Sequence, residues 1–227
     1  MKQFIIYILQ ILSILSYSSF LFSQQDSISL TDSQRNIIPP NQRVGEDFYV
    51  LHYDKIPQID RLNWKLKVHG AVKNKLNFNW DSFSRLDTVQ SVSDFHCVTT
   101  WSRLDNHWVG VRIRDVLQMA DPKSSAKYIT FKGADGYTTS LAIDDCTGDD
   151  DLLAFRWEGR DLGNNLGGPV RAVIPSKYGY KSCMWLVEMK LTKKQKLGYW
   201  EKRGYSNTAD PWKEERRAKK KQGESND

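Results

Sequence analysis

The chain has 227 residues, 40% of them hydrophobic and 26% charged, which is enough for one good-sized domain or two small ones with a buried core. The formal net charge is +6, and residues 213–221 hold six bases and two acids, so the rest of the chain is only mildly basic. Because no nucleic-acid-binding motif accompanies this charge, the sequence gives little support for a nucleic-acid-binding protein. Residues 213–227 are typical of a solvated, disordered tail with a frayed helix. The alternative is a surface that docks an anionic partner or a membrane.

The first 23 residues have the pattern of a secretory signal peptide. Lys2 precedes an apolar run over residues 4–15, and small and polar residues follow as far as Ser23. This pattern predicts export to the periplasm with cleavage near Ser23, although no twin-arginine motif is present. Because residues 4–22 are about long enough to span a bilayer, a membrane anchor facing the periplasm is the alternative. Residues 24–47 are polar, contain Pro39 and Pro40, and predict an extended linker.

The predicted elements of the domain begin with a strand over residues 64–70, where apolar and polar residues alternate. Residues 79–86 predict a short helix, since apolar residues recur one turn apart and Asn77 or Asn79 can cap its start. Residues 88–95 are again extended. A second helix is predicted from Ile113 to Ala120, where apolar residues fall at helical spacing and Asp121-Pro122 ends the pattern.

The second half of the domain is rich in strands. Residues 127–131 and 137–142 predict the two strands of a hairpin around a glycine turn. Further strand-like runs cover residues 152–157, 170–174 and 185–191. Two or three helices among many strands predict a mixed, strand-rich α+β domain over residues 48–212.

Three cysteines, Cys97, Cys146 and Cys183, are an odd number, so at least one thiol stays free within a single chain. Cys97 lies in the segment DFHCVTTWS at the end of a predicted strand, where a side chain can face a pocket. Three interpretations remain open: a buried apolar residue, a nucleophile paired with His96, or a ligand of a soft or redox metal. Neighbouring residues of a strand point to opposite faces, which argues against the pair with His96.

A glycine-rich, basic stretch covers residues 162–182 and reads LGNNLGGPVRAVIPSKYGYKS. Its glycines and asparagines expose backbone amides, and Arg171, Lys177 and Lys181 add positive charge, a combination that can cradle a phosphate. It is neither a P-loop nor a dinucleotide-binding fingerprint. A pair of glycine turns around one strand is the equally supported alternative.

An acidic run over residues 144–151 lacks the bidentate glutamate of a calcium loop, so we interpret it as a solvated loop. The four histidines have no HxxxH or HExxH spacing, which argues against a zinc site built from histidines.

Six segments in a fixed order, HCVTTWS, NHWVGVRIRDVL, DGYTTSL, LLAFRWEGRDL, GGPVRAVIPSKYGYKS and GYWEKRGY, resemble the sulfite-oxidase-type molybdopterin domain. The resemblance runs from about Pro39 to about Trp212 and is greatest to the compact bacterial members. It implies a molybdenum-molybdopterin cofactor with Cys97 as the metal ligand. The cofactor contacts that it implies are His52, Arg171, Tyr178, Gly179, Lys181 and Ser182, and it places Tyr137 and Asp135 beside the catalytic pocket.

The resemblance also implies a molybdopterin-dependent oxidoreductase that transfers an oxygen atom, acting on a small S- or N-oxide or sulfur compound. Reduction of an oxide is the preferred direction, because sulfite oxidases have arginines soon after the metal cysteine and here Arg103 is the first base. Without a haem or flavin motif, electrons must be exchanged with a separate redox protein, either a membrane haem protein or a soluble cytochrome. Leu166 and Met184 stand where many relatives have a polar and a basic residue. A cofactor-free binding module and a thiol enzyme that uses Cys97 are the alternative functions.

Overall fold

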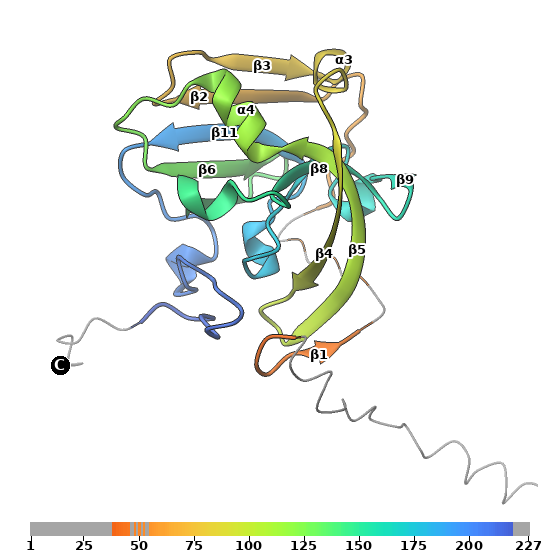
Figure 1. The fold of residues 1–227 in the computed structure, drawn as a ribbon, viewed down its shortest axis with the longest axis vertical. Coiled ribbons are helices and arrows are strands. Elements are labelled where there is room, and N and C mark those ends of the chain that lie inside the picture. Colours follow the sequence, from red (N-terminus) through yellow and green to blue (C-terminus); the bar gives the residue numbers. More distant parts are fainter. Residues whose placement is uncertain (1–37, 46–47, 49, 51, 53–54, 220–227) are drawn as a thin grey trace, which may run out of the picture. The chain divides into compact units, whose positions relative to one another are not determined.

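The structure is a computed structural model that describes residues 38–45, 48, 50, 52 and 55–219 (Figure 1). The predicted signal peptide and most of the predicted linker lie outside the described residues, as do residues 220–227. Within the described part, no helix is long and apolar enough to cross a membrane.

A five-stranded sheet forms one layer of the domain, with its strands in the order β3-β2-β11-β6-β7. Only β11 and β2 run parallel, and the predicted hairpin is confirmed as the antiparallel pair of β6 and β7. The alternation seen in the sequence buries Leu66 and Val68 on one face and leaves Lys65 and Lys67 exposed on the other. The strand bounds are β2 Lys65–Gly70, β3 Leu76–Asn79, β6 Tyr128–Gly133, β7 Thr138–Ala142 and β11 Leu186–Thr192.

A six-stranded sheet is built around the long strand β5, which pairs with β1, β4 and β8; β8 also pairs with β9 and β10. In Figure 1 the β4–β5 hairpin extends away from the five-stranded sheet, and β1 joins it near its tip. The turn at that tip, residues 97–100, carries Cys97. The strand bounds are β1 Arg43–Val44, β4 Val89–His96, β5 Trp101–Arg112, β8 Leu152–Trp157, β9 Arg160–Asp161 and β10 Arg171–Val173.

Two α-helices lie in the described part, at the predicted places. Helix α3, Trp80–Phe83, is shorter than predicted and begins with a reciprocal pair of hydrogen bonds between Asn79 and Ser82. Helix α4, Ile113–Ala120, ends at Asp121 in a left-handed conformation and covers one face of the five-stranded sheet (Figure 1). The short 3-10 turns are η1 Ile143–Cys146, η2 Asn164–Leu166, η3 Gly179–Lys181 and η4 Glu201–Arg203.

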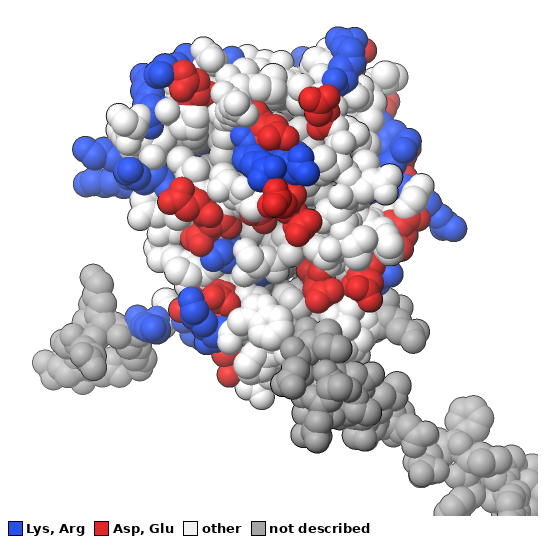
Figure 2. All heavy atoms as spheres, in the orientation of Figure 1, with Lys and Arg blue, Asp and Glu red and all other residues white. Residues whose placement is uncertain are grey.

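The acidic run is only partly the solvated loop that the sequence predicts. Asp151 is buried and its carboxylate accepts a hydrogen bond from the amide of Gly148 at 2.7 Å. Asp145 forms an ion pair with Lys177 at 2.8 Å, which ties this loop to the glycine-rich stretch. Over the face drawn in Figure 2, basic and acidic side chains are interspersed.

The basic C-terminal segment does not form the predicted frayed helix over its described residues. Arg217 bridges to Tyr205, and the amide of Ala218 donates to the carbonyl of Gly204 at 3.0 Å. The guanidinium of Arg216 reaches the carbonyl of Val98 in the Cys97 turn. Residues 216–218 therefore contact the domain.

Candidate cofactor site

A cavity of about 180 Å³ lies where loops of both sheets meet. Its wall comes from the Cys97 turn, the β6–β7 turn, strand β10, the η3 loop and the segment around η4. Of the residues that the sequence singles out, those on the wall are Cys97, Asp135, Tyr137, His52, Arg171, Gly179 and Ser182. Tyr178 and Lys181 are not on it. Residues as far apart in the chain as His52 and Ser182 thus converge on one space.

Cys97 lies at the cavity wall with 8% of its surface exposed. Its amide donates to the carbonyl of Trp101 at 2.8 Å, and its carbonyl accepts from the amide of Thr100 at 3.2 Å. Its Sγ is 3.1 Å from Oγ1 of Thr99. The turn places Thr100 at φ +79°, a conformation that β-branched residues rarely adopt.

His96 does not form the nucleophilic pair with Cys97 that the sequence left open. Its Nδ1 lies 2.8 Å from Oγ of Ser102, and it is not part of the cavity wall. Burial lowers the pKa of His96, against the opposing charge of Asp94. No cluster of three or more His, Cys, Asp or Glu side chains able to hold a metal occurs among the described residues. A metal held at Cys97 would therefore need most of its ligands from a cofactor.

Arg171 brings a buried cation to the same cavity. Its guanidinium donates to the carbonyls of Leu166 and Ser182, at 3.0 and 3.5 Å, while its Nε has no hydrogen-bond partner among the described residues. Aromatic rings surround it, with the centre of Phe48 5.4 Å away. No carboxylate pairs with it in the part of the chain that the structure describes, and burial lowers its pKa to about 10. A buried cation that no described carboxylate neutralises favours the binding of an anion in the cavity.

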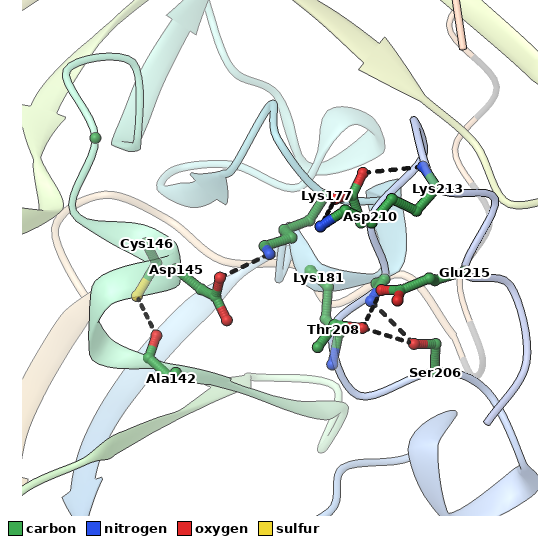
Figure 3. Close-up of polar contacts among 12 residues, drawn as sticks. Ala142, Asp145, Cys146, Lys177, Lys181, Ser206, Thr208, Asp210, Lys213 and Glu215 are labelled. Carbon is green, nitrogen blue, oxygen red and sulfur yellow. Dashed lines mark hydrogen bonds and ion pairs between the residues drawn. The ribbon is translucent and has the colours of Figure 1, made fainter. Parts of the chain in front are cut away.

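The η3 loop supplies another part of the wall, with Gly179, Tyr180 and Ser182. A Cβ at Gly179 would lie 2.1 Å from the ring of Phe95, so only glycine allows this ring to pack there. Ser182 Oγ accepts from the amide of Ile174 at 3.0 Å, which fixes the end of the loop beside Arg171. Lys177 anchors the start of the loop through Asp145, as Figure 3 shows.

Comparison with known proteins identifies the family to which the chain belongs. A family model described as the oxidoreductase molybdopterin binding domain matches residues 53–200. The oxidoreductase YuiH of Bacillus subtilis strain 168 is 38% identical over 184 residues, which are 81% of this chain and 93% of that protein. The chain belongs to the molybdopterin-binding oxidoreductase family.

Other relatives are longer. The catalytic subunit MsrP of the protein-methionine-sulfoxide reductase of Campylobacter jejuni is 30% identical over 156 residues, 61% of this chain and 52% of that protein. The chain thus spans about half the length of this relative. Among solved structures, the sulfane dehydrogenase SoxCD of Paracoccus pantotrophus has a TM-score of 0.58 at 16% identity, covering 76% of this chain and 55% of that one, and shows the same fold. The predicted fold class, the enzyme class and the molybdenum-molybdopterin cofactor are confirmed.

The residues present suit this cofactor. The Arg171 guanidinium, with its unpartnered Nε, offers a buried cation to a phosphate-bearing group, and the Cys97 thiol offers a soft ligand to the metal. Both side chains reach the same cavity from separate parts of the six-stranded sheet, Cys97 from the β4–β5 turn and Arg171 from strand β10. The molybdopterin domain therefore brings together the Cys97 segment and the glycine-rich, basic stretch, which are separate in the sequence.

Lys181 of the molybdopterin domain has a different environment from the one the motif implies. Its Nζ donates to Oε1 of Glu201 at 2.6 Å and to the carbonyl of Ser140 at 2.9 Å, with both side chains of the ion pair fully buried. Burial lowers the pKa of Lys181, and Glu201 opposes this shift. Tyr178 is buried as well, and Arg216 stacks on its ring at 5.1 Å.

Aromatic residues of the wall were not assigned a role by sequence reasoning. Phe48, Phe95, Tyr180, Trp200 and Tyr205 form much of the cavity surface. The high number of aromatic residues was visible in the sequence, but aromatic content alone does not distinguish a core from a pocket.

Proposed function

We propose that this oxidoreductase reduces a small, uncharged S- or N-oxide by oxygen-atom transfer. The observation that carries the proposal is the character of the cavity. Among its described lining residues Arg171 is the only lysine or arginine, and the cofactor phosphate needs that cation. Much of the remaining wall is aromatic or aliphatic, which suits an uncharged oxide better than sulfite.

The site residues take separate roles in this proposal. Cys97 is the protein ligand of the metal, and Arg171 binds the phosphate with support from Gly179, Ser182 and His52. When bound, the molybdenum-molybdopterin group supplies two-electron redox chemistry and exchange of an oxygen atom. Tyr178 and Lys181 act indirectly, since their described contacts hold the η3 loop in place.

Tyr137 holds a proton at the wall of the cavity. Its hydroxyl donates to the carbonyl of Tyr180 at 2.5 Å, and burial, with the nearby charge of Glu201, raises its pKa well above the ordinary value. The phenol therefore stays protonated; because its single hydrogen is donated to Tyr180, it would have to rotate away from that carbonyl to donate to a substrate oxygen. Asp135 accepts from the amide of Tyr137 at 3.0 Å and orients it.

The overall reaction requires a reductant. The bond between sulfur or nitrogen and oxygen breaks, and two electrons and two protons convert the oxygen to water. The electrons come from a separate redox protein, a membrane haem protein or a soluble cytochrome. Residues 193–219 carry nine lysines and arginines against four carboxylates, which supports docking of an acidic partner near η4. Residues 1–23 support export to the periplasm, with a membrane anchor as the alternative.

The test is purification from a host that makes the cofactor, followed by measurement of molybdenum and pterin content. Reduction of dimethyl sulfoxide, methionine sulfoxide and trimethylamine N-oxide is then measured with reduced benzyl viologen, beside oxidation of sulfite with ferricyanide. We expect turnover of an oxide and little oxidation of sulfite. Faster sulfite oxidation would overturn the substrate assignment, and protein without molybdenum would favour a binding module.

A further inference from the structure

The Cys97 turn is held from one side by the segment that precedes the molybdopterin domain. Gln42 is buried, and its Nε2 donates to the carbonyl of Cys97 at 3.1 Å. Its other end, Oε1, accepts from Oγ of Ser102 at 3.3 Å. The amide group of Gln42 is therefore fixed at both ends while it holds the carbonyl of the metal-binding residue.

From the other side, the C-terminal segment holds the next carbonyl. Arg216 Nη1 donates to the carbonyl of Val98, and its Nη2 lies 3.5 Å from the carbonyl of Asn41. Its guanidinium stacks on Tyr178 and lies 3.4 Å from the carboxylate of Glu214. The side chain is only 19% exposed, although it belongs to a segment that its charge alone marks as solvated.

These two contacts act on a turn that is not intrinsically stable. Thr100 is β-branched at positive φ, and such a residue keeps this conformation only where its surroundings enforce it. Backbone contacts from Arg43 to Thr100 and from Gly45 to Ser102 align the same region, at 3.0 and 2.9 Å. Loss of either side-chain contact would let the turn relax and shift the Cys97 thiol.

We propose that Gln42 and Arg216, the turn clamp, are positioning residues that set the orientation of the Cys97 thiolate toward molybdenum. Two segments from opposite ends of the chain thus complete the cofactor site. The proposal rests on the role of Cys97 as metal ligand. It predicts that changes in either clamp residue alter the metal spectrum and the accessibility of the thiol, beyond any effect on turnover.

The first experiment uses the loaded enzyme with Q42L and R216M, and K213M as the matched control. Lys213 is exposed, belongs to the same segment as Arg216 and pairs only with Asp210 among its described ion pairs. Electron paramagnetic resonance of Mo(V) is sensitive to the orientation of a thiolate ligand. We expect shifted spectra for both clamp variants and the wild-type spectrum for K213M. Wild-type spectra for both clamp variants would overturn the proposal.

The second experiment measures alkylation of Cys97 by iodoacetamide, located by mass spectrometry, in the full chain from a host without the cofactor. Loss of one hydrogen bond to the turn should raise the rate about five- to tenfold, against less than about twofold for K213M. Cys146 and Cys183 are fully buried and serve as internal references for global unfolding. Rates equal to wild type in both variants would also overturn the proposal.

Milder variants keep the test decisive if the first ones fold poorly. R216K retains a cation and Q42N retains the amide, and we expect smaller changes in the same direction. A wild-type Mo(V) spectrum in loaded C97S protein would refute the ligand role of Cys97, whereas the alkylation rates would still test the clamp. The two failures are therefore distinguishable.

Discussion

The buried ion pair of Lys181 and Glu201 gives a prediction that separates a structural role from cofactor binding. Lys181→Met keeps the length of the side chain but removes its charge. Among the described residues, Oε1 of Glu201 then retains two donors, Oγ1 of Thr139 at 2.7 Å and the amide of Ser140 at 3.1 Å, while its Oε2 has none. Removing one member of a buried ion pair costs about 3–5 kcal/mol of folding stability. Because two donors still bind the Glu201 carboxylate, we expect a loss at the lower end of this range, about 3 kcal/mol.

The second substitution, Glu201→Gln, should recover most of this loss. In the double variant no unpaired charge remains buried, and the glutamine amide can still accept from Thr139. We expect the double variant to lie within about 1–2 kcal/mol of the wild type, because replacing both charges is far less costly than orphaning one. Urea unfolding at neutral pH, followed by tryptophan fluorescence, measures the stability of the wild type, Lys181→Met and the double variant.

Molybdenum content of the folded fraction completes this test. A structural role for Lys181 predicts that folded Lys181→Met protein keeps its cofactor and that Lys181→Met/Glu201→Gln regains stability. If Lys181→Met were as stable as the wild type but free of cofactor, the lysine would be a direct phosphate contact and the argument from the ion pair would fail.

Three further predictions concern other groups. Cys97→Ser should abolish turnover and leave the thermal midpoint nearly unchanged, since the thiol has a single described side-chain contact; retained full activity would refute its role as ligand. Arg171→Leu should strongly reduce the molybdenum content of purified protein, measured by elemental analysis, yet leave the cofactor-free chain at least as stable, because it removes a buried unpaired cation. Burial raises the pKa of Asp151 from 3.8 to about 6, so the folded chain holds a proton that the unfolded chain has already lost, and stability falls as the pH rises through this window. Asp151→Asn should remove up to about 3 kcal/mol of this fall in urea titrations between about pH 4 and pH 7, and identical pH profiles would contradict the assignment.

Local patterns predicted most of the secondary structure, because alternation and helical spacing act within a few residues. The strand over residues 64–70, the helix Ile113–Ala120 and the β6–β7 hairpin all follow from such patterns. The pairing of Lys181 with Glu201 could not be predicted, since it depends on how η4 packs under strand β7 rather than on any spacing. Arg216 was missed for a related reason. A charged side chain in a basic segment is expected to be exposed to solvent. Arg216 is instead largely buried, because it packs on the ring of Tyr178 and donates to the carbonyl of Val98, 118 residues away in the chain.

Two departures from the family pattern have different consequences in this structure. Leu166 contributes its backbone carbonyl to Arg171, at 3.0 Å, and this contact does not depend on the identity of the side chain. Met184, by contrast, lines the cavity where the family resemblance predicts a base, and an apolar side chain there cannot form an ion pair with a phosphate. On the proposed assignment, we therefore expect retention of the cofactor to depend mainly on the guanidinium of Arg171 and the thiol of Cys97. Both groups are held in place by their surroundings, Arg171 among aromatic rings and Cys97 in a turn whose carbonyls accept hydrogen bonds from Gln42 and Arg216.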